Sequence, residues 1–322
     1  MQFGPVPVGA SVGRILAHNL TSPDGRRAFR KGHTVRAEDM AALRDVAGDT
    51  VYVATLEPGD VHEDEAARRL ARAVVGAGVT LGPAAGGRVN VLAAERGVLA
   101  LDLGRLDAVN ALDGLTIATL RQHSVVQPKT IVATVKIIPY AVPDARLRQA
   151  EAVGPGVVGV RPLPARRVGV ILTSSDAGRA RTIDLLEPPI RGRVEDLGSQ
   201  VLGVRPVAHT EAAVAEALAA FLDQGADAVI IGGETSIMDA NDITPQGVRR
   251  AGGVVEGYGA PAEPGNLLLL AYAGERPILG APGCVRSRHT NVVDLVLPRL
   301  LAGERLTRRD IAALGHGALL HG

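Results

Sequence analysis

Residues 226–232 read ADAVIIG, and residues 167–173 read RVGVILT. Both are short runs of mostly apolar residues, which is typical of strands that are covered on both faces of a parallel sheet. Between them the pattern predicts a helix over residues 183–197, a strand over 201–209 and a second helix over 210–224. Strands that alternate with helices of about ten to fifteen residues indicate βαβ units. We therefore expect an α/β fold, with a three-layer α/β/α domain around a mainly parallel sheet in the C-terminal half.

The first half of the sequence has a less regular pattern. Residues 50–56 and 89–93 are typical of short strands, and residues 37–46 of a short helix. Glycine and proline clusters interrupt the chain between about residues 150 and 165. We expect a mixed α+β N-terminal region over residues 1–155 and the α/β domain over residues 165–318.

Composition excludes several classes of protein. A chain of 322 residues with 46% hydrophobic residues can bury the cores of about two domains. The net charge of +1 and the 2% aromatic content argue against a nucleic-acid-binding surface. One cysteine rules out an internal disulfide, and no apolar run reaches the roughly twenty residues of a membrane span. We expect a cytoplasmic protein with no nucleic-acid or membrane partner.

Ligands of open α/β sheets bind outside the carboxyl ends of the strands. The first such connection, residues 173–184, offers hydroxyl groups, two carboxylates and two guanidinium groups. Hydroxyls and backbone N–H groups suit a phosphate or the edge of a polar ring, and arginine can add charge-assisted hydrogen bonds. The alternative is an ordinary helix start. The candidate ligand-binding residues of the first connection are Thr173, Ser174, Ser175 and Asp176.

The second connection, residues 232–244, combines two glycines with an oxygen-rich cluster. Glycines allow a ligand to approach the backbone closely. The carboxylates of Asp239 and Asp242, beside Asn241, are the kind of oxygen ligands that suit Mg²⁺. Helix capping by Asp242 is the simpler explanation for that one residue. The remaining candidates of this connection are Gly232, Gly233, Thr235 and Ser236.

The third connection, residues 281–290, places a Pro-Gly turn and two arginines before a helix. Successive backbone N–H groups in such a turn form a concave site for an anion. Cys284 could be a reactive thiol, a soft metal ligand or a small buried apolar residue, and the last is favoured because isolated cysteines are usually structural. The candidates are Pro282, Gly283, Cys284, Arg286 and Ser287.

These connections resemble the molybdopterin-binding domain family, whose fold molybdopterin adenylyltransferases share with molybdopterin molybdotransferases. The similar stretches are TSSD (173–176), GGETSIMDANDITP (232–245), YGAPAEPGNLLLLAY (258–272) and GAPGCVRSRHTNVVDLVLPRLLAGE (280–304). The molybdotransferases have Thr-Gly-Asp-Glu-like, Gly-Gly-x-Ser-x-Gly-x-x-Asp-like and Pro-Gly-Asn-Pro-like motifs at these places. The resemblance covers about residues 165–318. Residues 15–53 are similar to the N-terminal segment of molybdotransferase-like proteins, and the chain as a whole is most similar to bacterial stand-alone molybdopterin-binding proteins.

The resemblance implies a ligand and roles for the candidate residues. Molybdopterin, free or adenylylated, would place its phosphate at the third connection and its pterin near the glycines of the second. Asp239 and Asp242 would hold Mg²⁺ or position molybdate, and Asp176 would assist proton transfer. A transferase-like insertion of molybdate, a homo-oligomeric assembly and an apo-molybdoenzyme client follow as expectations.

Two other functions stay open from the sequence. Ser174 and Ser175 replace the Gly-Asp of the first motif, which favours a non-catalytic carrier of the molybdenum cofactor. A nucleotide hydrolase of the competence-damage-inducible type uses a related fold. Identification of the bound small molecule would separate a pterin from a nucleotide, and turnover would separate an enzyme from a carrier.

Overall fold

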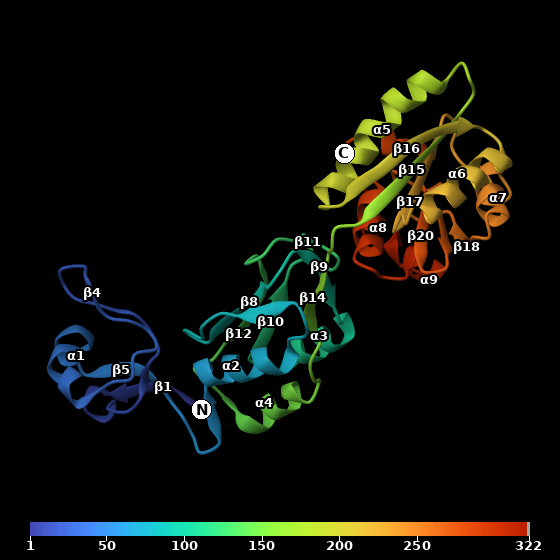
Figure 1. Ribbon diagram of the computed structural model, residues 1–322. Helices are drawn as coiled ribbons and strands as arrows, with labels where there is room; N and C mark the ends of the chain where they lie inside the picture. The colour runs from blue at the N-terminus through green and yellow to red at the C-terminus, as the bar shows by residue number, and fades with distance from the viewer. Residues whose placement is uncertain (321–322) are drawn as a thin grey trace. The chain divides into compact units, whose positions relative to one another are not determined.

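The chain forms two compact units, residues 1–161 (unit 1) and residues 162–322 (unit 2), in a computed structural model that describes residues 1–320 (Figure 1). Separate clusters of buried apolar side chains lie in the two units. No helix within the described residues is long and apolar enough to cross a bilayer.

Unit 1 consists of short strands and four helices. Its strands are β1 (Gln2–Pro7), β2 (Ile15–Leu16), β3 (Leu20–Thr21), β4 (Arg27–Phe29), β5 (Thr50–Thr55), β6 (Asp60–His62), β7 (Val79–Leu81), β8 (Arg88–Ala93), β9 (Gly97–Leu101), β10 (Leu115–Thr119), β11 (Val125–Val126), β12 (Ile131–Ile137), β13 (Ala141–Pro143) and β14 (Val158–Pro162). Its helices are α1 (Met40–Ala47), α2 (Glu63–Val74), α3 (Leu103–Asn110) and α4 (Asp144–Glu151).

The main core of unit 1 lies between helix α2 and a four-stranded sheet of order β10-β12-β8-β7. Ala66, Leu70 and Val74 follow one another at helical spacing on α2 and are fully buried. Val89 and Val91 alternate along β8 and face the same core. A smaller sheet of order β1-β5-β2 has a core of its own.

Unit 2 alternates strands and helices. Its elements are β15 (Arg167–Ser174), α5 (Arg179–Asp196), β16 (Gln200–Ala208), α6 (Glu211–Asp223), β17 (Ala228–Gly233), α7 (Ile243–Arg250), β18 (Val254–Tyr258), β19 (Leu269–Ala273), β20 (Arg276–Gly280), the 3-10 turn η3 (Gly283–Arg286), α8 (Val292–Leu301) and α9 (Arg308–Ala312). These bounds follow the apolar runs of the sequence closely at β15, β16 and β17.

One six-stranded sheet of order β16-β15-β17-β20-β19-β18 forms the centre of unit 2. β16, β15, β17 and β20 are parallel neighbours, whereas β19 is antiparallel to both β20 and β18. The expected α/β fold with a mainly parallel sheet is therefore confirmed.

Helices cover both faces of this sheet (Figure 1). Gly169 of β15 faces Phe221 of α6, and Val248 of α7 belongs to the same apolar cluster. Gly232 of β17 faces Leu186 of α5 on the opposite side. Because successive residues of a strand point to opposite faces, β15 and β17 contribute side chains to both layers.

One local prediction was wrong. Helix α5 begins at Arg179 rather than at residue 183, so the first connection shortens to residues 175–178. The glycine-rich segment 76–87 contains β7, and α8 continues past Pro298 to Leu301.

Candidate functional site

The connections that follow β15, β17 and β20 leave the sheet at the same edge. Thr173 pairs with Gly233 in the β15–β17 ladder, and Ile231 pairs with Gly280 in the β17–β20 ladder. We call them loop one (175–178), loop two (234–242) and loop three (281–291). The end of β16 reaches this edge too, because Ser174 pairs with Ala208.

Two buried hydroxyl groups lie directly before loop one. Thr173 and Ser174 are the last residues of β15, with 1% and 2% of their surface exposed. His209 Nδ1 lies 3.3 Å from Thr173 Oγ1. Ser174 Oγ is buried and has no hydrogen-bond partner among the described residues. An unsatisfied buried hydroxyl is costly, so it marks a place where a ligand or water would find a polar partner.

Ser175 connects loop one to loop two through Glu234. The Ser175 N–H and Oγ–H both donate to Glu234 Oε2, at 2.8 and 2.9 Å. Ser175 Oγ also accepts the Gly178 N–H at 3.0 Å. The backbone N–H of Glu234 donates to Thr173 O at 2.8 Å, so side chain and backbone fix the two loops together.

Glu234 and His209 were not among the residues predicted from the sequence. The N–H and hydroxyl of Ser175 lower the pKa of the Glu234 carboxyl, and the charges of His209 and Arg181 lower it further. The signal that could have found Glu234 is a carboxylate directly after two glycines at a strand end. His209 directly follows β16, which is the same kind of position.

Asp176 lies at the surface rather than among these groups. Its side chain is 94% exposed and forms an ion pair of 2.7 Å with Arg179 one turn along the chain. An exposed ion pair of this kind contributes little to stability. The carboxylate is therefore accessible to a ligand and is not held in place by burial.

Loop two is folded around its two aspartates. Asp242 Oδ1 accepts the Ile243 N–H at 2.7 Å and caps α7, while its Oδ2 accepts the Met238 N–H at 2.9 Å. Asp239 Oδ1 accepts the Asn241 N–H at 2.8 Å. The capping interpretation of Asp242 thus describes what the structure contains. No group of three or more His, Cys, Asp or Glu side chains in residues 1–320 is arranged to hold a metal ion.

A hydrogen bond connects loop two to Tyr258, the last residue of the edge strand β18. Its hydroxyl donates to Ile237 O at 2.7 Å. Burial raises the pKa of Tyr258, and the nearby charges of Asp239 and Asp242 raise it further. The phenol consequently stays protonated and keeps its donor role at neutral pH.

Protein atoms leave little room for a side chain at the glycines that end β17 and at Gly283 of loop three. A Cβ on Gly233 would lie 2.5 Å from Thr173 Oγ1 and 2.9 Å from Thr235 O. A Cβ on Gly283 would lie 2.9 Å from Ser236 Oγ, which shows that loops two and three touch. A Cβ on Gly232 would lie 3.3–3.6 Å from side-chain carbons of α5 and β15. These glycines permit close packing of the loops on one another.

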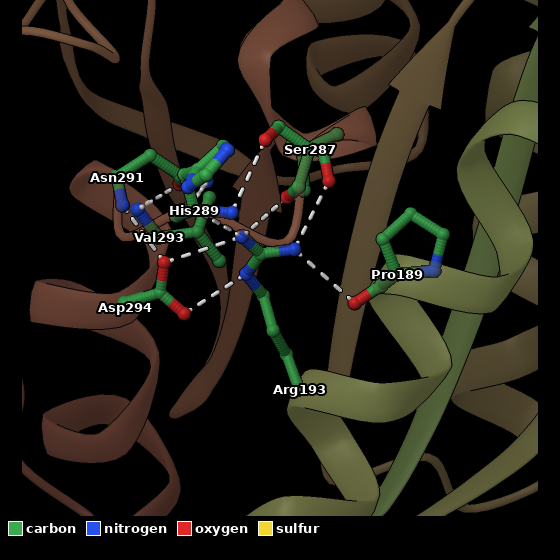
Figure 2. Close-up of polar contacts among 8 residues, drawn as sticks. Pro189, Arg193, Ser287, His289, Asn291, Val293 and Asp294 are labelled. Carbon is green, nitrogen blue, oxygen red and sulfur yellow. Dashed lines mark hydrogen bonds and ion pairs between the residues drawn. The ribbon is translucent and has the colours of Figure 1, made fainter. Parts of the chain in front are cut away.

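Loop three is held from below by Arg193 of α5 (Figure 2). Its guanidinium reaches the carbonyls of Val285, Ser287 and His289 at 3.0, 2.8 and 3.1 Å. It also forms an ion pair of 2.9 Å with Asp294 in the first turn of α8. Arg193 was not among the residues predicted from the sequence, because nothing in a helical pattern distinguishes one arginine from another.

The predicted residues of loop three lie together in and beside η3. Pro282 precedes the turn, Gly283, Cys284 and Arg286 belong to it, and Ser287 follows it. Burial raises the pKa of the half-buried Cys284 thiol. A thiol with a raised pKa is a poor nucleophile at neutral pH, which agrees with a structural role.

The family comparisons cover parts of both units. Residues 169–302 match the family model described as a probable molybdopterin binding domain. The matched stretch lies within unit 2. Residues 5–55 match a domain of unknown function, DUF8806. A search of curated proteins found no match.

Solved structures of proteins named for molybdopterin biosynthesis are similar to this chain. A MoeA protein from Pyrococcus horikosii is 14% identical, with 94% of this chain and 75% of that chain covered and a TM-score of 0.32. MoaB from Thermus thermophilus is 20% identical, covering 43% of this chain and 98% of its own, with a TM-score of 0.33. The Mog protein from Mycobacterium ulcerans is 23% identical, covering 42% and 92%, with a TM-score of 0.31.

Proposed function

We propose that unit 2 binds molybdopterin, free or adenylylated, at the edge of the sheet where loops one, two and three meet, and that it acts in molybdenum cofactor biosynthesis. The observation that carries this proposal is the contact among the three loops, through Ser175 with Glu234 and through Gly283 with Ser236. Three contacting loops at the carboxyl edge of a parallel sheet form the usual ligand position of such folds. The match of residues 169–302 to the molybdopterin-binding family model supports this class of ligand.

Each loop has a proposed share of the ligand. Loop three would take the terminal phosphate, because its turn and two arginines present backbone donors and positive charge. Loops one and two would take the polar edges of the pterin. The proposed binding residues are Thr173, Ser174, Ser175, Gly232, Gly233, Thr235, Ser236, Pro282, Gly283, Cys284, Arg286 and Ser287.

Mg²⁺ fits this proposal only together with the ligand. Asp239 and Asp242 would hold it along with phosphate oxygens, since Mg²⁺ is commonly bound by one or two carboxylates and a substrate phosphate. The ion would neutralise phosphate charge and orient molybdate. Asp176 would hold or release a proton as molybdate is bound.

A carrier is the second candidate function. The contacts of the three proposed catalytic carboxylates favour it: Asp176 is paired with Arg179, and Asp239 and Asp242 accept backbone N–H groups of their own loop. A carrier needs affinity for the cofactor but no proton transfer. Delivery to an apo-molybdoenzyme and assembly into a homo-oligomer belong to this proposal.

The decisive experiment identifies the ligand. The full chain is purified from a host that makes the molybdenum cofactor, and the released small molecule is analysed by mass spectrometry. A pterin supports the proposal, whereas a nucleotide or an empty protein that also fails to bind added molybdopterin contradicts it. Turnover of adenylylated molybdopterin with molybdate and Mg²⁺ then separates an enzyme from a carrier.

A matched pair of variants tests the site itself. Arg286→Ala removes one charged donor from loop three, and we expect affinity to fall by about 1.5–3 kcal/mol, or roughly 10- to 100-fold in Kd. Arg309→Ala removes an equal charge from the exposed side of α9 and is the control. Equal affinity of the two variants would show that loop three does not bind the phosphate.

A further inference from the structure

Arg193 uses its whole guanidinium group in hydrogen bonds within the protein. Only 9% of its surface is exposed, and its side chain contacts six acceptor atoms through its five N–H groups. The acceptors are the carbonyl of Pro189 on its own helix, three carbonyls of loop three and both oxygens of Asp294 (Figure 2). No N–H group of the guanidinium is left for solvent.

Arg193 binds the carbonyl of every second residue in this part of loop three, namely Val285, Ser287 and His289. Those of Ser287 and His289 both point toward the guanidinium, and the peptide bonds that follow them are trans. In a planar trans peptide the N–H of the next residue points the opposite way. The N–H groups of Arg288 and Thr290 are therefore turned away from Arg193.

These two N–H groups make no hydrogen bond to another atom of residues 1–320. Arg288 and Thr290 are both exposed residues of loop three. Backbone N–H groups without a protein acceptor can donate to an anion, and the Arg288 side chain adds positive charge to the same segment. With the carbonyls turned inward, no carbonyl oxygen of Ser287 or His289 faces that surface.

Arg193 also fixes the helix that follows the loop. Asp294 Oδ2 accepts the Asn291 N–H at 2.8 Å in the capping box of α8, and the same carboxylate pairs with Arg193. Removal of the guanidinium would take this donor away from four carbonyls, two of them in buried hydrogen bonds, and from the Asp294 carboxylate. Loop three would then lose the constraint that keeps its carbonyls inward.

We propose that Arg193 is a positioning residue that holds loop three so that the backbone N–H groups of Arg288 and Thr290 face the phosphate of the ligand. This inference rests on the proposed function of loop three as the phosphate site. It adds two backbone contacts and one buried side chain to the residues predicted from the sequence.

The first experiment uses two stable probes, neopterin monophosphate and neopterin, titrated into the full chain. The wild type should prefer the phosphorylated probe by about tenfold or more, as expected for hydrogen bonds to a charged group. Arg193→Met should reduce that preference to about twofold with little change for neopterin, and Arg193→Lys should lie between. Arg191→Met, on the same helix and paired with Glu187 and Glu195, is the matched control.

A purely structural role would weaken both probes equally and leave the preference for phosphate intact. That result for Arg193→Met would overturn the inference. If Arg193→Met does not fold, Arg193→Lys decides, because it keeps the charge with at most three donors. An unchanged phosphate preference in Arg193→Lys would then count against a positioning role.

The second experiment follows the amides directly with inorganic phosphate and ¹⁵N NMR of the full chain. The signals of Arg288 and Thr290 should shift in the wild type and in Arg191→Met, and remain in place in Arg193→Met. Shifts in the wild type without any pterin binding would refute the proposed ligand and support this inference. Binding of neopterin monophosphate without movement of these two signals would refute the inference and leave the proposed function standing.

Discussion

Gly169→Ala adds one methyl group at a fully packed contact in unit 2. The new Cβ would lie 2.6 Å from Cγ of Phe221 and 2.9 Å from both Cδ atoms of that ring. Phe221 is 1% exposed and belongs to the core between the sheet and α6. Non-bonded carbon atoms prefer about 3.5–4.0 Å, so the ring would have to move by roughly 1 Å in a close-packed core.

The same substitution at Gly192 should have the opposite sign. Gly192 lies inside α5, and nothing is within 4 Å of an added Cβ. Alanine in a helix interior is more stable than glycine by about 0.5–1 kcal/mol. Overpacking at Gly169 should cost about 1–3 kcal/mol, so the free energies of unfolding should differ by roughly 1.5–4 kcal/mol between the two variants.

Thermal unfolding of the full chain, combined with hydrogen exchange, measures this difference. For a unit of this size, 1 kcal/mol corresponds to about 2–4 °C in Tm. Exchange of peptides from β15 and β17 reports which unit has changed, since the two units need not unfold together. Similar stability of Gly169→Ala and Gly192→Ala would refute the packing derived from Phe221.

A double variant tests the mechanism behind this prediction. Phe221→Leu makes room beside Gly169, so the methyl group should cost less in that background than in the wild type. The coupling between the two substitutions should reach about 0.5–3 kcal/mol, because the residues are in direct contact. Additive effects would mean that another neighbour limits the space at Gly169.

Three further predictions concern charge. Arg69→Met should destabilise unit 1 by about 1–3 kcal/mol, because Arg69 pairs with both Glu151 and Asp144. Arg68→Met removes an exposed ion pair and should cost less than about 0.5 kcal/mol. Hydrogen exchange of α2 compares the stability of the two variants. The hydrogen bond from Arg69 lowers the pKa of the Asp144 carboxyl, and the charge of Arg148 lowers it further, so the stabilisation is present above the ordinary carboxyl range and is lost as pH falls through the lowered value. Exchange of α4 measured toward low pH should show this loss, and Arg69→Met should reduce it while the Arg148 pair remains. Burial raises the pKa of Cys284, so iodoacetamide should alkylate it slowly at neutral pH and much faster after denaturation, as mass spectrometry would show; equal rates would contradict its burial.

The regular pattern of the C-terminal half allowed its architecture to be predicted. The apolar runs 167–173 and 226–232 are long enough for strands and too short for helices, and turn residues bound them. The evidence for these strands is local, because a strand that is buried on both faces has apolar side chains at consecutive positions of one segment. The positions of the three connections follow from it, since parallel strands put their carboxyl ends at one edge.

The antiparallel edge β19–β18 could not be derived in the same way. A strand sequence records which side chains are buried, but not which neighbour it pairs with or in which direction. The start of α5 at Arg179 was missed for a related reason. Ser175 accepts the Gly178 N–H in the short turn before the helix, and no residue type marks that position uniquely.

The sequence by itself determined that unit 2 is a helix-covered parallel sheet with polar connections after three of its strands, because hydrophobic periodicity is a property of neighbouring residues. Tertiary structure alone decided that Glu234 bonds Ser175, 59 positions away, and that Arg193 binds loop three more than 90 positions away. Such contacts depend on which distant segments the sheet register and the helix packing bring together. The residues around a charged side chain in the sequence do not indicate which distant residue will pair with it.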